Sequence, residues 1–370
     1  MLEETIKEMI RLEGAITFER FMEAALYMPE HGYYMSGREV IGPGGDFYTS
    51  THLHPVFGWL LAIQMDEMRS LLGEPPGFTI VEVGAGRGYL SEGIISYVLR
   101  ELDWGDGWRY VIVERNPHMR RAQEELLSGH GGLVQWASSL AAVERFCGCV
   151  VSNELIDALP VHLIQKEDVF REVYVDVTGD GFEDRLGALS TPELAEYIDR
   201  YRIPEIPGYR TEVNLCARGF LEEVAGVLAE GFVITIDYGY PFREYYAEER
   251  SRGTLLCYHR HTCNEDPYRN VGEQDITAHV NFSSLKDWGE EMGLRTVGYC
   301  PQGTFLVSLG IDRVITEMLR ADPSFQAAIP RIKGLLLGMG DTHKVMVQYK
   351  GRRELEGLKG FELRNRLYLL

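Results

Sequence analysis

The sequence predicts an α/β protein built around a doubly wound, mostly parallel sheet. Apolar, strand-like runs alternate with runs of helical periodicity, and a glycine-rich loop over residues 79–88 joins one such strand to the next helix. Alternating β and α segments are typical of parallel sheets, because each crossover helix covers one face of the sheet. Strands are expected near residues 79–83, 110–114, 133–136, 149–153, 232–237, 296–300 and 345–349.

The glycine-rich loop reads T-I-V-E-V-G-A-G-R-G and places glycines at Gly84, Gly86 and Gly88. Glycine allows a tight turn and lets a ligand lie against bare backbone, because it has no Cβ. The helical pattern begins directly after the loop, and a helix N-terminus favours phosphate-like or nucleotide-type ligands. A tight strand-to-helix turn with a surface acid is the purely structural alternative.

The spacing of this loop favours S-adenosylmethionine over NAD. A dinucleotide fingerprint has its third glycine three positions after the second, whereas this loop has G-x-G-x-G. Glu82, just before the loop, would repel a pyrophosphate but would suit the ammonium of an amino-acid moiety. Glu114 ends the next strand, where a carboxylate can accept hydrogen bonds from two ribose hydroxyls.

A second group of polar residues follows the strand over 149–153. Asn153 and Glu154 end that strand, and Asp157 comes three positions later, which on a turn puts both carboxylates on one side. Asp237 ends the strand over 232–237. Carboxylates of this kind suit a guanidinium substrate, which stays protonated and needs charged hydrogen-bond acceptors. The alternative is a helix N-terminus, where acids are favoured by the helix dipole.

Composition narrows the class of protein. The chain has 370 residues and a net charge of −19, which argues against a surface that binds nucleic-acid phosphates. It has no apolar run near the roughly 18 residues of a membrane span. The acidic start Met1-Leu2-Glu3-Glu4 fits no signal or transit peptide, and six cysteines without disulfide-framework density indicate a reducing compartment. We therefore expect a cytoplasmic globular enzyme with no nucleic-acid or membrane partner.

Further segments surround the predicted core. Residues 1–28 read as amphipathic helix, with Thr17 as the N-cap of a second helix, and a glycine- and tyrosine-rich stretch over 31–50 reads as a ligand-covering loop or a mobile surface loop. A hairpin is expected where residues 161–163 pair with 172–175. The expected domains are an N-terminal extension over 1–75, a core over 76–155 and 231–350, an inserted subdomain over 156–230, and a substrate-side insertion over 239–285.

The cysteines and histidines between Cys257 and Cys263 could suggest a metal site. On one extended strand, Cys257, His259, His261 and Cys263 would share a face. Alternate strand positions do not wrap one ion tetrahedrally, so no metal site is predicted here.

Several stretches together resemble the MidA-like family. They are H-G-Y-Y (31–34), G-D-F-Y-T-S (45–50), E-V-G-A-G-R-G (82–88), N-E-L-I-D-A-L-P-V-H (153–162), D-Y-G-Y (237–240), G-T-L-L-C-Y (253–258), G-E-Q-D-I-T-A-H-V-N-F (272–282) and Q-G-T-F-L (302–306). The resemblance implies a seven-stranded class I methyltransferase fold with an N-terminal addition and an inserted subdomain, and S-adenosylmethionine as cofactor. The eukaryotic activity of the family is symmetric dimethylation of arginine in a respiratory complex I subunit.

The resemblance and the residue patterns together give an expected site. The predicted cofactor residues are Glu82, Gly84, Ala85, Gly86 and Gly88 at the methionine part, Glu114 at the ribose, Ser139 and Leu140 at the adenine, and Asn153, with Asp46 and Phe47 closing the site. Glu154, with Asp157 or Asp237, would hold a substrate guanidinium.

Other functions stay open at this point. The enzyme could methylate a small molecule or another protein side chain. A different class of function is an assembly chaperone that keeps the cofactor fold without catalysis. A homodimer is one open form of assembly.

Overall fold

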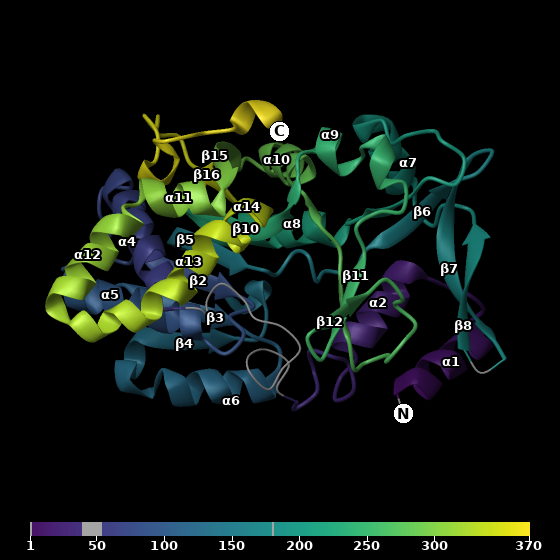
Figure 1. Cartoon of the computed structure of the whole chain (residues 1–370), viewed down its shortest axis with the longest axis horizontal. Helices are drawn as coiled ribbons and strands as arrows, with labels where there is room; N and C mark the ends of the chain where they lie inside the picture. Colours follow the sequence, from purple (N-terminus) through teal and green to yellow (C-terminus); the bar gives the residue numbers. More distant parts are fainter. Residues whose placement is uncertain (1, 39–53, 180) are drawn as a thin grey trace. The chain divides into compact units, whose positions relative to one another are not determined.

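The computed structural model describes residues 2–38, 54–179 and 181–370 (Figure 1). The chain forms two compact units. The core unit contains Tyr48–Leu155, Phe220–Gly239 and Ser284–Leu370. The appended unit contains Met1–Phe47, Ile156–Gly219 and Tyr240–Ser283. The domain bounds expected from the sequence stay a prediction.

The sheet of the core unit confirms the predicted α/β fold. Its strands run in the order β15-β16-β10-β5-β2-β3-β4. Strands β10, β5, β2, β3 and β4 are parallel, whereas β16 runs antiparallel to both β10 and β15. Each predicted strand is present: β2 (Thr79–Val83), β3 (Arg109–Val113), β4 (Val134–Ala137), β5 (Phe146–Asn153), β10 (Leu228–Tyr240), β15 (Arg295–Pro301) and β16 (His343–Lys350).

The strands form because their apolar residues are buried in the sheet interior. Ile80, Ile112, Val151, Ile234 and Val347, from five different strands, lie in one hydrophobic cluster and are fully buried. Parallel strands are covered on both faces, which is why they read in the sequence as continuous apolar runs rather than alternating ones.

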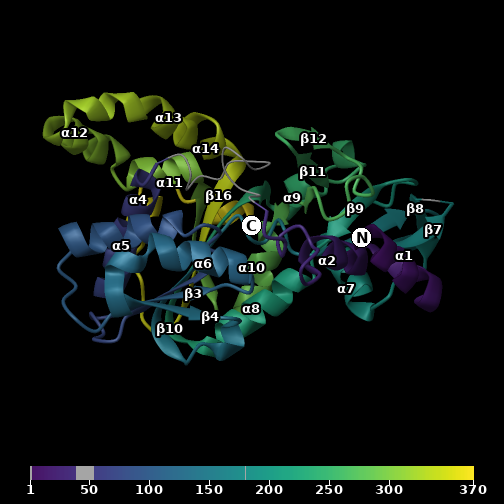
Figure 2. The same ribbon diagram turned by 90° about the horizontal axis from the view of Figure 1, so that it is seen from below.

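Helices complete the core unit. Five of them are α4 (Val56–Leu71), α5 (Tyr89–Glu101), α6 (Pro117–Leu126), α8 (Cys216–Val227) and α10 (Phe282–Glu291). The first residues of α8 and α10 belong to the appended unit. A further group consists of α11 (Gln302–Ser308), α12 (Ile311–Ala321), α13 (Ile329–Leu337) and α14 (Met339–Thr342). Figure 2 shows that this last group lies together beside β16.

Helices α4 and α5 approach each other closely at a pair of glycines. A Cβ built on Gly58 would lie 2.9 Å from the Cα of Gly93. Any side chain at either position would therefore separate the helices.

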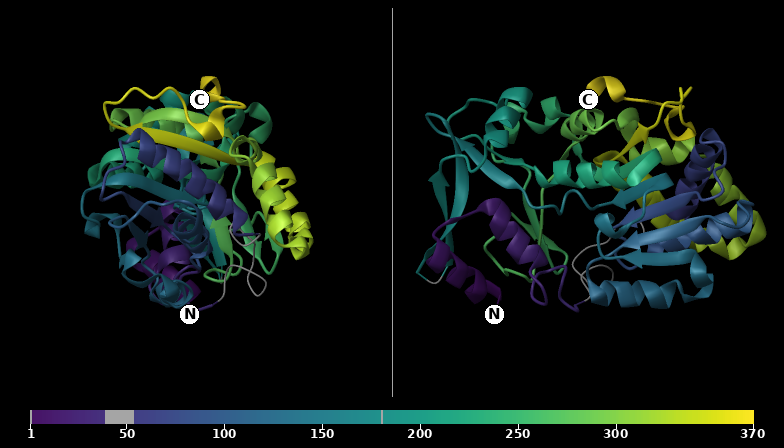
Figure 3. Two further views of the ribbon diagram at one scale, coloured as in Figure 1. Left: turned by 90° about the vertical axis from the view of Figure 1, so that its left-hand side faces the viewer. Right: turned by 180° about the vertical axis from the view of Figure 1, so that it is seen from behind.

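The C-terminal stretch after β16 packs back on the core unit. Leu358 and Phe361 are buried in its hydrophobic cluster, and the Arg366 N–H donates to the Tyr299 carbonyl of β15 at 2.7 Å. This stretch is the yellow coil at the top of both views in Figure 3.

The appended unit contains a separate antiparallel sheet in the order β1-β7-β6-β9, with β8 paired to β7. The strands are β1 (Ile16–Thr17), β6 (His162–Lys166), β7 (Phe170–Thr178), β8 (Gly181–Gly187) and β9 (Arg210–Val213). The predicted hairpin is confirmed as β6 and β7. The helices of the appended unit are α1 (Leu2–Glu13), α2 (Phe18–Tyr27), α7 (Pro192–Tyr201) and α9 (Phe242–Tyr245). The predicted cap is also confirmed, since Thr17 accepts from the Arg20 N–H at 3.2 Å.

The prediction of one extended strand over 257–263 is wrong. The chain forms β11 (Leu256–His259) and β12 (Thr262–Asn264), which pair antiparallel, and β13 (Asp275–Thr277) pairs with β11 on its other side. The reversal occurs at Arg260 and His261, whose φ angles are 49° and 59°. Two successive left-handed residues make the tight turn that matches strand twist, although neither is the glycine or asparagine usual there. Within the described ranges, no three His, Cys, Asp or Glu residues are grouped as metal ligands.

None of the helices described is long and apolar enough to cross a membrane.

Candidate functional site

The glycine-rich loop makes the tight turn expected from its sequence. Gly84, Gly86 and Gly88 have φ angles of 71°, 53° and 87°, and α5 begins directly after them. These left-handed conformations suit glycine and are costly for residues with a Cβ. The Gly84 N–H donates to the Val113 carbonyl at 3.2 Å, and half-buried Ala85 packs against the hydrophobic core. The loop therefore presents backbone rather than side chains.

Glu82 stands on β2, two residues before the first glycine of this loop. Its Oε2 accepts hydrogen bonds from the hydroxyls of Ser91 on α5 at 2.5 Å and Tyr110 on β3 at 2.6 Å. The side chain is 2% exposed. Burial raises the pKa of the Glu82 carboxyl from 4.5 to about 7, against the lowering effect of the two hydroxyls, and the nearby Glu114 carboxylate raises it further. Glu82 thus joins β2 to α5 and β3, and its contact with a ligand stays a prediction.

Glu114 follows the last residue of β3 and is held from two sides. Its Oε1 accepts from the Asn116 N–H at 2.8 Å, and its Oε2 accepts from the Gln123 side chain at 3.1 Å. Burial raises the pKa of its carboxyl, and these hydrogen bonds oppose the shift. A carboxylate oxygen can accept more than one hydrogen bond, so both oxygens retain capacity for a ligand hydroxyl.

The remaining predicted cofactor residues of the core unit lie after β4 and at the end of β5. Ser139 is exposed, and Leu140 is buried at 3% exposure. Asn153 donates from Nδ2 to Glu154 Oε1 at 3.1 Å. The buried Asn153 Oδ1 has no hydrogen-bond partner among the residues that the structure describes. Asp46 and Phe47 lie outside the described residues.

These residues fit an adenosyl cofactor. Strands β5, β2, β3 and β4 are adjacent and parallel, so Asn153, the glycine loop, Glu114 and Ser139 follow their carboxyl ends along one edge of the sheet. Ligands of doubly wound sheets bind at that edge. A bare-backbone loop, a partly satisfied carboxylate and a buried amide oxygen in need of a donor match a ligand with an amino-acid end and ribose hydroxyls. When bound, S-adenosylmethionine supplies an electrophilic methyl group.

Glu154 lies at the same edge of the core unit in a strained conformation. Its φ is 49°, which is unusual for a non-glycine residue, and its N–H donates to the Ile236 carbonyl of β10 at 2.8 Å. Residues held in such conformations are often functional. Asp237, the next residue of β10, is fully buried, and its Oδ1 accepts from the Tyr238 N–H at 2.9 Å. Glu154 thus follows the last residue of β5, whereas Asp237 lies inside the neighbouring strand β10, three residues before its end, so the prediction that Asp237 ends its strand is wrong.

Asp157 belongs to the appended unit. The interpretation of this residue as a helix N-cap is wrong, because residues 154–161 form turns and lead directly into β6. Pro160 explains part of this, since the residue before a proline disfavours the helical region. Asp157 is 5% exposed, and its carbonyl accepts from the Ala278 N–H at 2.9 Å.

Sequence reasoning assigned no role to an acid and tyrosine group around Asp275 in the appended unit. The Tyr34 hydroxyl donates to Asp275 Oδ2 at 2.8 Å, and the Tyr27 ring stacks on Tyr34 with centroids 5.5 Å apart. Burial raises the pKa of the Tyr34 hydroxyl, and Asp275 and Asp157 raise it further. Tyr34 and Asp275 stood in the H-G-Y-Y and G-E-Q-D motifs, which was the available signal.

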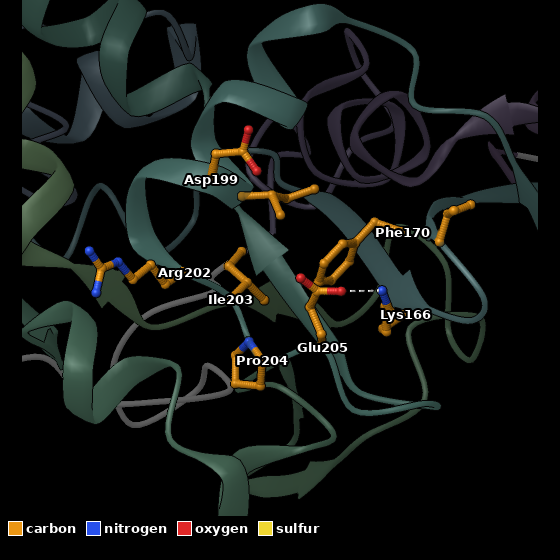
Figure 4. A pocket seen from close by; sticks show the side chains of 9 residues that line it. Lys166, Phe170, Asp199, Arg202, Ile203, Pro204 and Glu205 are labelled. Carbon is orange, nitrogen blue, oxygen red and sulfur yellow. Dashed lines mark hydrogen bonds and ion pairs between the residues drawn. The ribbon is translucent and has the colours of Figure 1, made fainter.

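A pocket of about 520 Å³ lies elsewhere in the appended unit, between β6, β7 and α7. Figure 4 shows Lys166 and Glu205 paired across it, with Nζ and Oε2 2.7 Å apart, and Phe170 beside them. Its lining includes none of the predicted site residues, so it is no part of the candidate site.

The fold and the site together define a transferase that uses an adenosyl cofactor. Residues 60–300, more than half of the chain, match the family described as "Putative S-adenosyl-L-methionine-dependent methyltransferase". The chain belongs to this family and is an S-adenosylmethionine-dependent methyltransferase.

Solved structures agree with this assignment. A Burkholderia thailandensis protein bound to S-adenosyl-homocysteine is 33% identical, with a TM-score of 0.90 over 100% of this chain and 96% of that one. A native structure from the same organism gives a TM-score of 0.87 at 33% identity, again over 100% of this chain and 96% of that one. The methyltransferase fold and its cofactor predicted from the sequence are therefore confirmed.

Curated relatives are named as arginine methyltransferases. "Protein arginine methyltransferase NDUFAF7, mitochondrial" of Danio rerio is 28% identical over 85% of this chain and 78% of its own length. The protein of the same name in Homo sapiens is 28% identical over 82% and 72%. The Drosophila melanogaster homologue is 28% identical over 95% and 85%.

These names contradict the predicted cytoplasmic location, because the relatives are mitochondrial. The prediction rested on an acidic first stretch and on free cysteines. Free cysteines do not distinguish one reducing compartment from another.

Proposed function

We propose that this methyltransferase acts on arginine of a protein substrate. The names of the curated relatives support an arginine acceptor. The observation that carries the proposal is a pair of carboxylates on neighbouring strands, with Glu154 held at a φ of 49° directly after β5 and the fully buried Asp237 within β10.

The chemistry of arginine explains why such carboxylates would be needed. A guanidinium has a pKa above about 12, so it enters a site protonated and is a poor nucleophile until a proton is removed. Glu154 would hold the guanidinium through charge-assisted hydrogen bonds and accept its proton as the methyl group is transferred. Asp157 or Asp237 would serve as a second acceptor. Positioning the nitrogen in line with the methyl group supplies much of the remaining rate enhancement.

The cofactor residues are proposed in the roles expected from the sequence. Gly84, Ala85, Gly86 and Gly88 would line the methionine part, with Glu82 behind them. Glu114 would bind the ribose, Ser139 and Leu140 would border the adenine, and Asn153 would also contact the cofactor. Asp46 and Phe47 would close the site.

The finer parts of the proposal concern product and partner. The reaction would be symmetric dimethylation, and the substrate a respiratory complex I subunit, as the MidA-like family implies. The chain would act as a complex I assembly factor in that role, and a homodimer is one form it could take. A small-molecule acceptor or a non-catalytic chaperone would be the alternatives.

The test is transfer of label. The purified chain is incubated with methyl-labelled S-adenosylmethionine and an extract of its host cells, and labelled residues are located by mass spectrometry. Label on arginine of one or a few proteins supports the proposal. Label on another side chain or in the small-molecule fraction overturns the arginine assignment, and no transfer to any component favours the chaperone.

A further inference from the structure

Gln123 is a buried amide that joins the segments of the candidate cofactor site. It lies on α6 and is fully buried. Its Nε2 donates to the Gly86 carbonyl at 2.7 Å and to Glu114 Oε2 at 3.1 Å, and its Oε1 accepts from Trp136 Nε1 at 3.1 Å. The partners come from the glycine loop, from the end of β3 and from β4.

Burying a primary amide is costly unless its polar atoms are hydrogen-bonded. An apolar side chain at position 123 would fill the same space without that requirement. Gln123 instead uses both amide hydrogens and its oxygen on atoms of three segments. Packing of α6 alone does not require these contacts.

The contact with Glu114 fixes the carboxylate plane. The Asn116 N–H at 2.8 Å holds one carboxylate oxygen and Gln123 holds the other, so rotation of the group would break both hydrogen bonds. Each oxygen then keeps capacity for one further donor, as two vicinal hydroxyls require. Charge-assisted hydrogen bonds of this kind are stronger than neutral ones.

The contact with Gly86 fixes a peptide plane of the loop. In a trans peptide the carbonyl and the following N–H point in opposite directions. Since the Gly86 carbonyl points to Gln123 on α6, the Arg87 N–H of the same peptide points away from α6. Gln123 thereby sets the orientation of this peptide within the loop.

We propose that Gln123 is a positioning residue for the cofactor, which holds the Glu114 carboxylate and the Gly86 peptide in the orientation that the ribose and methionine parts require. The inference rests on the ribose role proposed for Glu114. It needs no contact between Gln123 and the cofactor.

The experiment measures binding by the full chain with titration calorimetry. Gln123→Met keeps the length of the side chain and removes its hydrogen bonds. Its Kd for S-adenosylhomocysteine should rise about tenfold or more. Glu125→Met, at an exposed position of the same helix, is the matched control and should leave the Kd unchanged. An unchanged Kd in Gln123→Met overturns the proposal.

A second ligand separates positioning from general loosening of the fold. An S-adenosylhomocysteine analogue without the 2′ and 3′ hydroxyls does not use Glu114. The Gln123→Met loss should therefore be at least about threefold smaller with this analogue. Equal losses with both ligands would mean that Gln123 does not act through Glu114, which overturns the ribose part of the proposal.

Two further variants complete the design. Gln123→Glu keeps the shape of the side chain but sets a carboxylate against Glu114. It should also raise the Kd for S-adenosylhomocysteine tenfold or more, and it replaces Gln123→Met in the test if that variant does not fold. Glu114→Gln tests the underlying assignment. If it leaves the Kd unchanged, the ribose role of Glu114 fails. If it weakens binding while both Gln123 variants bind normally, only the role of Gln123 fails.

Discussion

Oε2 of Glu154, which follows the last residue of β5, lies 3.8 Å from Nε2 of His343, the first residue of β16. His343 is 6% exposed, and its ring also contacts Tyr238 of the intervening strand β10, with centroids 5.5 Å apart. Asn153 Nδ2 contacts the other oxygen of Glu154 at 3.1 Å. A hydrogen bond from Asn153 therefore holds one oxygen of Glu154, while the His343 ring lies near the other oxygen, beyond hydrogen-bonding distance.

These contacts make Glu154→Gln the variant that best separates catalyst from chaperone. The amide keeps the shape of the side chain but loses the charge and the proton acceptor. Turnover should fall by about tenfold to a hundredfold, because charge-assisted hydrogen bonds and proton transfer both act on the transfer step. The affinity for S-adenosylhomocysteine should change little, since the loss concerns the acceptor. The assay uses a peptide carrying the arginine that becomes labelled in extract, and transfer at the parental rate would show that Glu154 does not clamp the substrate.

Gly86→Val should abolish binding of S-adenosylhomocysteine. The φ of Gly86 is 53°, which a β-branched residue adopts only at a high cost, and its side chain would occupy the space that the bare loop leaves for a ligand. Titration calorimetry measures the effect. Gly132→Ala, at a position where a Cβ meets no atom within 4 Å, is the control and should bind normally. Full binding by a folded Gly86→Val protein would place the cofactor elsewhere.

The strands of the core could be predicted because their signal is local. Ile80 and Val81 lie in a continuous apolar run, which is typical of a strand that is covered on both faces. The positions of Gly84, Glu114 and Glu154 followed, since strand ends define the binding edge of a parallel sheet. The hydrogen bonds of Gln123 could not be predicted. Helical periodicity places this residue on α6 but gives no information about its three partners on other segments. The reversal at Arg260 and His261 was missed for a related reason, because neither residue carries the usual turn signal.

Gly58→Ala should destabilise the core unit. Its Cβ would lie 2.9 Å from Gly93 of α5, so the two helices would have to separate. The free energy of unfolding should fall by about 1–3 kcal/mol, as for other overpacked sites. Gly226→Ala, on α8, meets no atom within 4 Å and should be neutral or up to about 1 kcal/mol stabilising, because alanine favours helix. Urea denaturation of both variants makes the comparison, and equal stabilities would show that the close approach of α4 and α5 has no energetic role.

The last prediction concerns the pH dependence that Glu82 gives to stability. Burial raises its pKa from 4.5 to about 7, so between these two pH values the folded state binds a proton that the unfolded state has released. The contribution of this group to stability should therefore be fully present below about pH 4.5, fall as pH rises toward 7, and level off above that, with a total loss on the order of 3 kcal/mol. Glu82→Gln cannot ionise, and its amide can still hydrogen-bond the hydroxyls of Ser91 and Tyr110. Urea midpoints between pH 5 and 8 should thus decline less steeply in Glu82→Gln than in the parent, and Glu125→Gln should follow the parent. Parallel curves for the parent and Glu82→Gln would mean that the Glu82 carboxyl is ionised throughout this range, and that the hydroxyls of Ser91 and Tyr110 outweigh its burial.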